Sequence, residues 1–120
     1  MYLAIATCPN IMLAVCKLSQ FMNFYRNIHW NAAKHVIHYL KGTHTLQLRL
    51  GGQNPTKLLG FSDASYVCCP NSGKSISTYC FSLRSGVISW ASRKQKTIAQ
   101  STCDTEYIAC SKAAHKYMWL

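Results

Sequence analysis

The stretch that decides the fold is LLGFSDASYVCCPNSGKS, residues 58–75. Its first part is apolar on both faces, which is typical of a strand inside a sheet. That part ends at Asp63, one of only three acidic residues in the chain. The other two, Asp104 and Glu106, stand close together near the C-terminal end. The question is therefore whether these carboxylates meet to hold a metal ion or are separate surface charges.

On the N-terminal side of this stretch the sequence predicts two helices. Apolar residues recur at helical spacing over residues 9–22, with Pro9 in the first turn, and again over residues 27–41. Asn27 is the expected cap of the second helix, and Gly42 is a good stop signal. We therefore expect a helical segment over residues 1–43.

From residue 44 onwards the period changes to two. HTLQLRL, residues 44–50, alternates leucines with polar residues as a half-buried strand does, and further strands are expected over residues 57–63, 75–83 and 87–92. A short hairpin with Gly86 at positive φ would join the last two strands. The sequence thus predicts a second domain over residues 44–120 and an α+β fold class.

A final helix is expected from about residue 101 to 120. Its apolar stripe would be buried and its lysines, Lys112 and Lys116, would lie opposite. The residues of that stripe are Cys103, Tyr107, Cys110, Ala114 and Tyr117.

The chain is strongly basic, with 13 Lys and Arg against 3 Asp and Glu and a formal net charge of +10. This excess favours a polyanionic partner, and nucleic acid is the first to consider. The densest basic patch is SRKQK, which makes Arg93, Lys94 and Lys96 the candidate nucleic-acid-binding residues. A merely solvated cationic surface is the alternative reading.

The cysteines and the N-terminal residues indicate the cellular compartment in which the chain is expected. Seven cysteines occur without a CxxC motif or zinc-ligand spacing, and we interpret them as reduced thiols. The uncharged N-terminal run is broken by Pro9 and is too short to cross a bilayer, so we expect an intracellular chain with neither signal peptide nor transmembrane segment. A secreted protein with oxidised cysteines is the least favoured class.

The three carboxylates differ in their expected roles. Glu106 falls about 60° from the centre of the expected apolar stripe, at a border where a carboxylate needs a partner. Asp104 follows Ser101 by three residues, which matches a helix cap. Asp63 could share a divalent cation with Glu106 or form a turn with the residues that follow it, and spacing leaves both readings open.

Several long stretches resemble the Pol polyproteins of copia-type LTR retrotransposons. They are HWNAAKHVIHYLKGT (29–43), LLGFSDAS (58–65) and KSISTYCFSLRSGVISWASRKQKTIAQSTCDTEYIACSKAA (74–114), in the order of that family. The resemblance covers nearly the whole chain. It corresponds to the end of the reverse transcriptase connection and the first part of the ribonuclease H domain.

The resemblance implies a magnesium-dependent nuclease that cleaves the RNA strand of RNA–DNA hybrids. FSDAS would place Asp63, and TEYIAC would place Glu106, at two metal-binding catalytic positions. The family's second acid is replaced by Ser65, and its third catalytic aspartate follows this helix on a fourth strand. We therefore expect half a site, weak or absent Mg²⁺ binding, and little activity in the isolated chain. The alternative is a non-catalytic nucleic-acid-binding module.

The implied partners are an RNA–DNA hybrid or another nucleic acid, with no membrane. Without the fourth strand, one edge of the strand that contains Asp63 would be open. HTLQLRL, the rest of a Pol polyprotein or a second copy of the chain could cover that edge.

Overall fold

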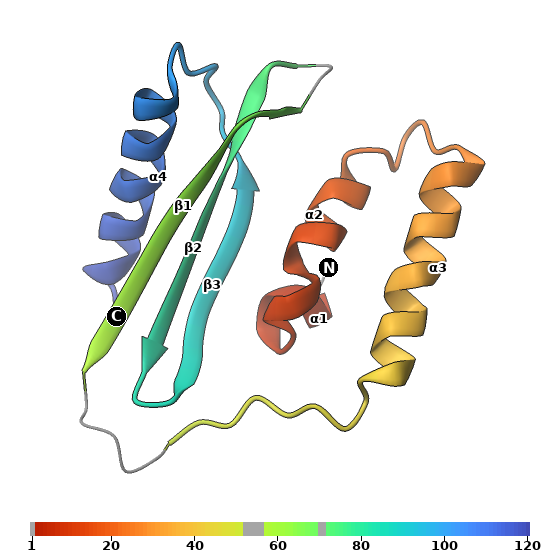
Figure 1. The fold of residues 1–120 in the computed structure, drawn as a ribbon, viewed down its shortest axis with the longest axis horizontal. Coiled ribbons are helices and arrows are strands. Elements are labelled where there is room, and N and C mark those ends of the chain that lie inside the picture. Colours follow the sequence, from red (N-terminus) through yellow and green to blue (C-terminus); the bar gives the residue numbers. More distant parts are fainter. Residues whose placement is uncertain (1, 52–56, 70–71) are drawn as a thin grey trace. The chain divides into compact units, whose positions relative to one another are not determined.

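The chain forms two compact units, Met1–Leu48 and Arg49–Leu120, in a computed structural model that describes residues 2–51, 57–69 and 72–120. The first unit is helical, and the second combines a sheet with one helix (Figure 1). The α+β class is thereby confirmed.

The first unit contains two principal helices, as expected, although their bounds differ. It begins with a short helix that the sequence did not predict, α1 (Tyr2–Ala6). A 3-10 turn, η1 (Pro9–Ile11), leads into α2 (Met12–Ser19), and α3 (Asn27–Gly42) follows. The helix expected over residues 9–22 therefore ends three residues early, at Ser19.

The cap of α3 is Arg26, so the prediction of Asn27 was wrong by one residue. The backbone N–H of Arg26 donates to Nδ1 of His29 at 3.1 Å, which satisfies a donor at the start of the helix. The His29 ring also stacks on Phe21, with ring centroids 4.1 Å apart. A histidine side chain thus takes the place that Glu or Gln usually occupies at the third position of a capping box.

The strand expected over residues 44–50 is not formed. Residues 46–50 have no regular secondary structure, and Leu46, Leu48 and Leu50 are all exposed. An alternating pattern produces a strand only where a neighbouring strand supplies hydrogen bonds, and no described strand pairs with this segment. It therefore does not cover the open edge of the sheet, and the division between the units falls within it.

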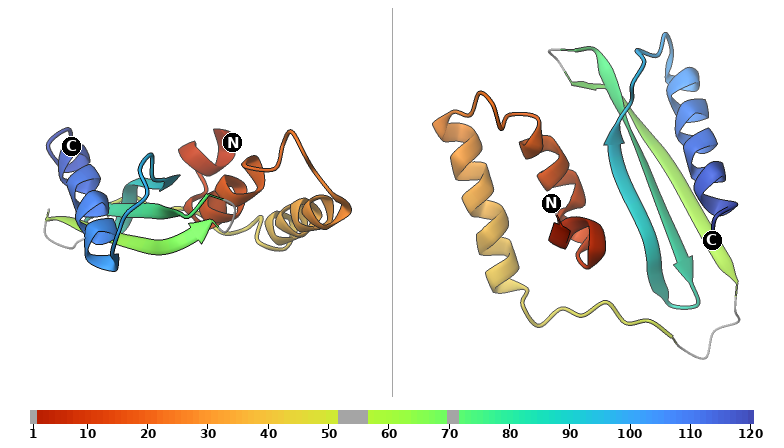
Figure 2. Two further views of the ribbon diagram at one scale, coloured as in Figure 1. Left: turned by 90° about the horizontal axis from the view of Figure 1, so that it is seen from above. Right: turned by 180° about the vertical axis from the view of Figure 1, so that it is seen from behind.

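The second unit is a three-stranded antiparallel sheet in the order β1-β2-β3, formed by β1 (Leu58–Cys69), β2 (Lys74–Leu83) and β3 (Gly86–Lys94). The helix α4 (Thr102–Tyr117) packs against β1 and β2, on one face of the sheet (Figure 2). Among the described residues β1 pairs only with β2, which leaves its other edge open.

Contacts with α4 show which strand residues face the helix. Phe81 of β2 lies against Tyr117, with ring centroids 6.2 Å apart, and the hydroxyl oxygens of Ser75 and Thr105 are 3.4 Å apart. The odd-numbered residues of β2 therefore face α4. Gly60 of β1 pairs with Phe81, and a Cβ at Gly60 would come within 2.5 Å of that ring. A glycine is needed here because the Phe81 ring fills the space.

The β2–β3 hairpin was predicted at the right place, but with the wrong residue at positive φ. Arg84 has a φ of 56°, whereas Gly86 does not adopt positive φ. Gly86 is instead buried, and a Cβ there would come within 2.5 Å of the carbonyl oxygen of Arg49. Gly86 is thus required by the close approach of another backbone segment.

The predicted buried stripe of α4 was also wrong. All five of its residues, from Cys103 to Tyr117, are exposed, and the buried residues are Thr105, Ala109 and Ala113. These three are small and recur every four residues, so they lie on one face and let the helix approach the sheet closely. The close packing of α4 against the sheet therefore buries its small residues, and the larger apolar residues of the predicted stripe stay exposed.

Candidate metal and nucleic-acid site

Asp63 lies on β1, next to the open edge of the sheet. Its side chain is exposed, and its strand partner is Thr78 of β2. Because side chains alternate along a strand, Asp63 belongs to the opposite face from Gly60 and Ser62, which face α4. A cation shared with the helix must therefore be reached around the free edge of β1.

Glu106 lies one turn into α4 and is exposed. The start of this helix is fixed by Ser101, as expected: its hydroxyl oxygen accepts a hydrogen bond from the backbone N–H of Asp104 at 3.1 Å. The hydroxyl of Thr105 donates to the carbonyl oxygen of Ser101 at 3.0 Å. The turn that leads to Glu106 is therefore held in place by two hydrogen bonds on its N-terminal side.

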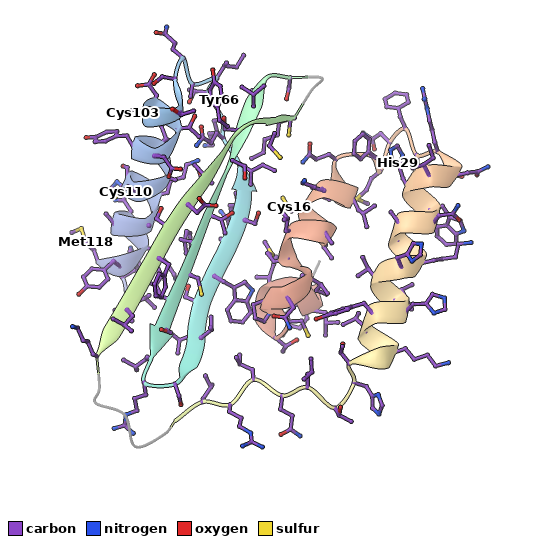
Figure 3. All side chains as sticks on the ribbon, viewed as in Figure 1. Cys16, His29, Tyr66, Cys103, Cys110 and Met118 are labelled. Carbon is purple, nitrogen blue, oxygen red and sulfur yellow. The ribbon has the colours of Figure 1, made fainter. Side chains whose placement is uncertain are left out.

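Tyr66 ties β1 to the loop that enters α4. Its hydroxyl donates to the carbonyl oxygen of Gln100 at 3.5 Å (Figure 3). Tyr66 follows Asp63 by three residues, and Gln100 precedes Glu106 by six. This contact brings the end of the strand that contains one carboxylate to the start of the helix that contains the other.

Gln95, which the sequence analysis did not single out, locks α4 to the sheet. It is 1% exposed, and its Nε2 donates to the Ser77 hydroxyl at 2.8 Å and to the Thr105 carbonyl oxygen at 3.1 Å. Its backbone N–H donates to the carbonyl oxygen of Ser75 at 2.8 Å. The residue bonded on the helix, Thr105, directly precedes Glu106, so Gln95 positions the helical turn of that carboxylate.

The two flanks of α4 carry opposite charges. Glu106 lies about 60° to one side of the centre of the face formed by Thr105, Ala109 and Ala113, and Lys112 lies about 60° to the other. Burial, followed by the positive charges of Lys96 and Arg93, lowers the pKa of Lys112 below its ordinary value. The Lys112 flank is therefore turned toward β3 and the loop after it. The Glu106 flank is turned toward the free edge of β1.

The predicted basic patch is divided by strand alternation. Arg93 pairs with Ser77, whose side chain faces α4, whereas Lys94 pairs with Ile76 on the other face of the sheet. Lys112, which the sequence analysis placed away from the sheet, is half-buried and close enough to Arg93 and Lys96 to feel their charges. The small-residue spacing of Thr105, Ala109 and Ala113 was the signal that could have oriented the helix correctly.

The two exposed carboxylates near the edge of β1 offer oxygen ligands of the kind that Mg²⁺ prefers. Two carboxylates leave most of an octahedral coordination sphere to water. Within residues 2–51, 57–69 and 72–120 no group of three His, Cys, Asp or Glu side chains is placed to bind a metal ion. Asp63 and Glu106 therefore do not belong to a metal centre of three or more such side chains within the described residues.

Two further observations concern the cysteines of α4 and the character of the helices. Cys103 and Cys110, labelled in Figure 3, are free and exposed thiols on α4. None of the helices in the described part of the chain has the length and apolar character needed to span a bilayer.

Comparison with known proteins finds a secreted effector protein and transposon polyproteins among the relatives of this chain. Over 120 residues the chain is 41% identical to the secreted RxLR effector protein 161 of Plasmopara viticola, and it covers 84% of that protein. It is 38% identical over 120 residues to the retrovirus-related Pol polyprotein from transposon TNT 1-94 of Nicotiana tabacum, and 36% identical over 121 residues to that from transposon RE2 of Arabidopsis thaliana. No family model and no solved structure matches the chain.

The fold and these similarities define a retrotransposon-derived α+β protein. The chain belongs to the family of copia-type retrotransposon Pol polyproteins. It spans 9% and 8% of the length of the tobacco and Arabidopsis polyproteins described above.

Proposed function

We propose that this chain is part of the ribonuclease H region of a retrotransposon Pol polyprotein, which cleaves the RNA strand of RNA–DNA hybrids. Asp63 and Glu106 would hold one Mg²⁺ at the free edge of β1. The observation that carries the proposal is the hydrogen bond from Tyr66 of β1 to the loop that enters α4, because it joins the strand of one exposed carboxylate to the helix of the other.

The same geometry supports only a partial site. When bound, Mg²⁺ would lower the pKa of a coordinated water and polarise a phosphodiester oxygen. Hydrolysis by two metal ions requires several carboxylates around cations roughly 3.5–4 Å apart, and these 120 residues contain three acidic side chains, of which Asp104 lies at the start of α4. We propose that a further carboxylate from the rest of a Pol polyprotein completes the site, and that the chain alone is nearly inactive.

A hybrid-cleavage assay tests this function. The chain is incubated with a labelled RNA–DNA hybrid and Mg²⁺, alone and after fusion to the segment that follows it in a Pol relative. We expect cleavage by the fusion, loss of cleavage in Glu106→Gln, and retention of cleavage in Asp104→Asn. Cleavage that survives both Glu106→Gln and Asp63→Asn would refute the assignment. Binding of the hybrid by the fusion without any cleavage would favour the non-catalytic nucleic-acid-binding module.

A second candidate function is favoured by the similarity to the Plasmopara viticola protein, which the chain covers over most of its length. In that case this retrotransposon-derived chain would serve as a secreted effector. The test is to compare the amounts of the chain in the medium and inside the cells that express it. Retention inside the cells would exclude secretion, whereas accumulation in the medium would favour it over a role in reverse transcription.

A further inference from the structure

We propose that Arg93, Lys96 and Lys112 form one binding site for the phosphate groups of a nucleic-acid backbone, and that Lys94 is not part of it. The site lies on the flank of α4 that faces β3, away from the Glu106 flank. The choice of a nucleic acid as the polyanion rests on the proposed function. The composition of the site rests on the geometry of the described residues.

The register of the sheet puts Arg93 on the face of the sheet that α4 packs against. Arg93 pairs with Ser77, and the Ser77 hydroxyl is bonded to Gln95, which is bonded in turn to the Thr105 carbonyl of the helix. Lys96 directly follows Gln95, so its backbone starts from the same buried anchor. The site is therefore built from the end of β3, the loop after it and the helix that this loop leads to.

Lys112 reaches the same place from the helix. At the N-terminal end of α4, the carbonyl oxygen of Thr105 is bonded to Gln95, which directly follows β3. Near the other end of the helix, Tyr117 lies against Phe81 of β2. Phe81 pairs with Ser89, near the start of β3. The helix, which packs against β1 and β2, therefore runs antiparallel to β3, and a residue two turns after Thr105 comes level with the last part of that strand. Lys112 is at that position and on the flank turned toward β3.

Three like charges at one place are unfavourable in the free protein. Partial burial lowers the pKa of Lys112, and the positive charges of Lys96 and Arg93 lower it further. The chain tolerates this cluster although all three acidic residues lie in the same unit. A bound phosphate would remove the repulsion, because one anion can accept hydrogen bonds from both Lys and Arg.

The phosphodiester backbone of a nucleic acid is the anion that best matches this cluster. A row of phosphates requires several cations presented along one surface, and contacts to phosphate carry no sequence information. Arg93 and Lys112 approach from a strand and a helix, so they present charges on two elements held together by Gln95. The site would therefore position a nucleic acid without selecting a sequence.

The test is a binding titration of the full chain with a short RNA–DNA hybrid and with a DNA duplex of the same sequence, without divalent cations. Omitting Mg²⁺ separates this site from Asp63 and Glu106, so each proposal can fail alone. The variants are Lys112→Met, which keeps most of the apolar stem, together with Arg93→Gln and Lys96→Gln. Lys94→Met is the matched control, because it removes an equal charge from the adjacent residue on the other face.

We expect each of the three variants to weaken binding by roughly three- to tenfold at low salt and to reduce the slope of log affinity against log salt by about one. Lys94→Met should leave the slope unchanged, and Lys112→Arg should restore binding. Lys112→Met should also raise the melting temperature of the free chain. Equal losses in Lys94→Met and Lys112→Met would overturn the proposal, as would unchanged binding in all three variants.

Discussion

The two units of the chain differ in how much they bury. In the second unit, the buried residues come from all three strands, from α4 and from the loop before it, and they include Ile76, Phe81 and Ala109. Over residues 2–48 of the first unit, the buried residues are Ala4 and Ile11, while Trp30 of α3 is 59% exposed. Helical periodicity is present in both units, so periodicity alone does not produce a core.

The difference shows where stability is expected to reside. Buried apolar area is the main favourable term in folding, and an amphipathic helix is stable in water chiefly when its apolar face is packed. The second unit meets that condition, whereas α3 leaves Ile28 and Ile37 exposed as well as Trp30. We therefore expect the second unit to determine the global stability of the chain.

The largest expected effect comes from removing a core side chain in the second unit. Phe81 is 3% exposed, so Phe81→Ala should lower the free energy of unfolding by about 3–5 kcal/mol. The matched control is Phe61→Ala on the neighbouring strand, where the side chain is 64% exposed. Urea denaturation measures both. A control variant that loses as much stability as Phe81→Ala would show that the buried face has been assigned wrongly.

The next effect concerns the buried amide that joins the sheet to α4. Gln95→Leu would leave the Thr105 carbonyl without its side-chain donor and would remove a second bond at Ser77, so we expect a loss of about 2–4 kcal/mol. Gln100→Leu is the control, since that side chain is exposed. The same denaturation curves report the change. Equal stability of the two variants would contradict the role of Gln95.

Two glycines sharpen the comparison between the units. A Cβ at Gly60 would come within 2.5 Å of the Phe81 ring, so Gly60→Ala should cost about 1–3 kcal/mol. Gly42 ends α3, and no atom lies within 4 Å of the place that a Cβ would occupy there, so Gly42→Ala should be neutral or stabilising by up to about 1 kcal/mol. In thermal melts, the melting temperature of Gly60→Ala should therefore fall, whereas that of Gly42→Ala should rise or stay unchanged.

The smallest effect is the pH dependence due to Lys112. Burial and the charges of Lys96 and Arg93 lower the pKa of its folded form, so the unfolded chain binds the proton more tightly. The free energy of unfolding should then rise with pH between the folded pKa and the ordinary lysine value. Lys112→Met should remove that rise in alkaline melting curves. If the free energy of unfolding rises with pH by the same amount in the variant, the rise must come from another titratable group.

The elements that the sequence predicted correctly are those whose signals are local. Ser101 forms the N-cap of α4, and the hairpin between β2 and β3 turns within the short connection over residues 84–86 that the sequence predicted. The strand over residues 44–50 failed because its alternation requires a partner, and the burial of α4 failed because packing distance favoured Ala109 and Ala113 over larger apolar residues. Both failures depend on neighbours that are distant in sequence.

The residues of the candidate site also fall into those that sequence motifs identified and those that depend on distant neighbours. Asp63 and Glu106 were identified by their position in motifs, and their meeting at a metal ion stays a prediction. Gln95 was missed because a glutamine between two basic residues reads as part of a solvated patch. Its burial arises from the register of β2 against β3 and from the packing of α4. The separation of Lys94 from Arg93 also follows from that register.

The most direct measurement of the central claim is Mn²⁺-induced line broadening in NMR spectra of the full chain, with Mn²⁺ in place of Mg²⁺. We predict that the signals of Asp63 and Glu106 broaden together at the same Mn²⁺ concentration. Either Asp63→Asn or Glu106→Gln should abolish the broadening at both positions. Broadening at one position that persists when the other carboxylate is removed would show that the two residues do not share a cation.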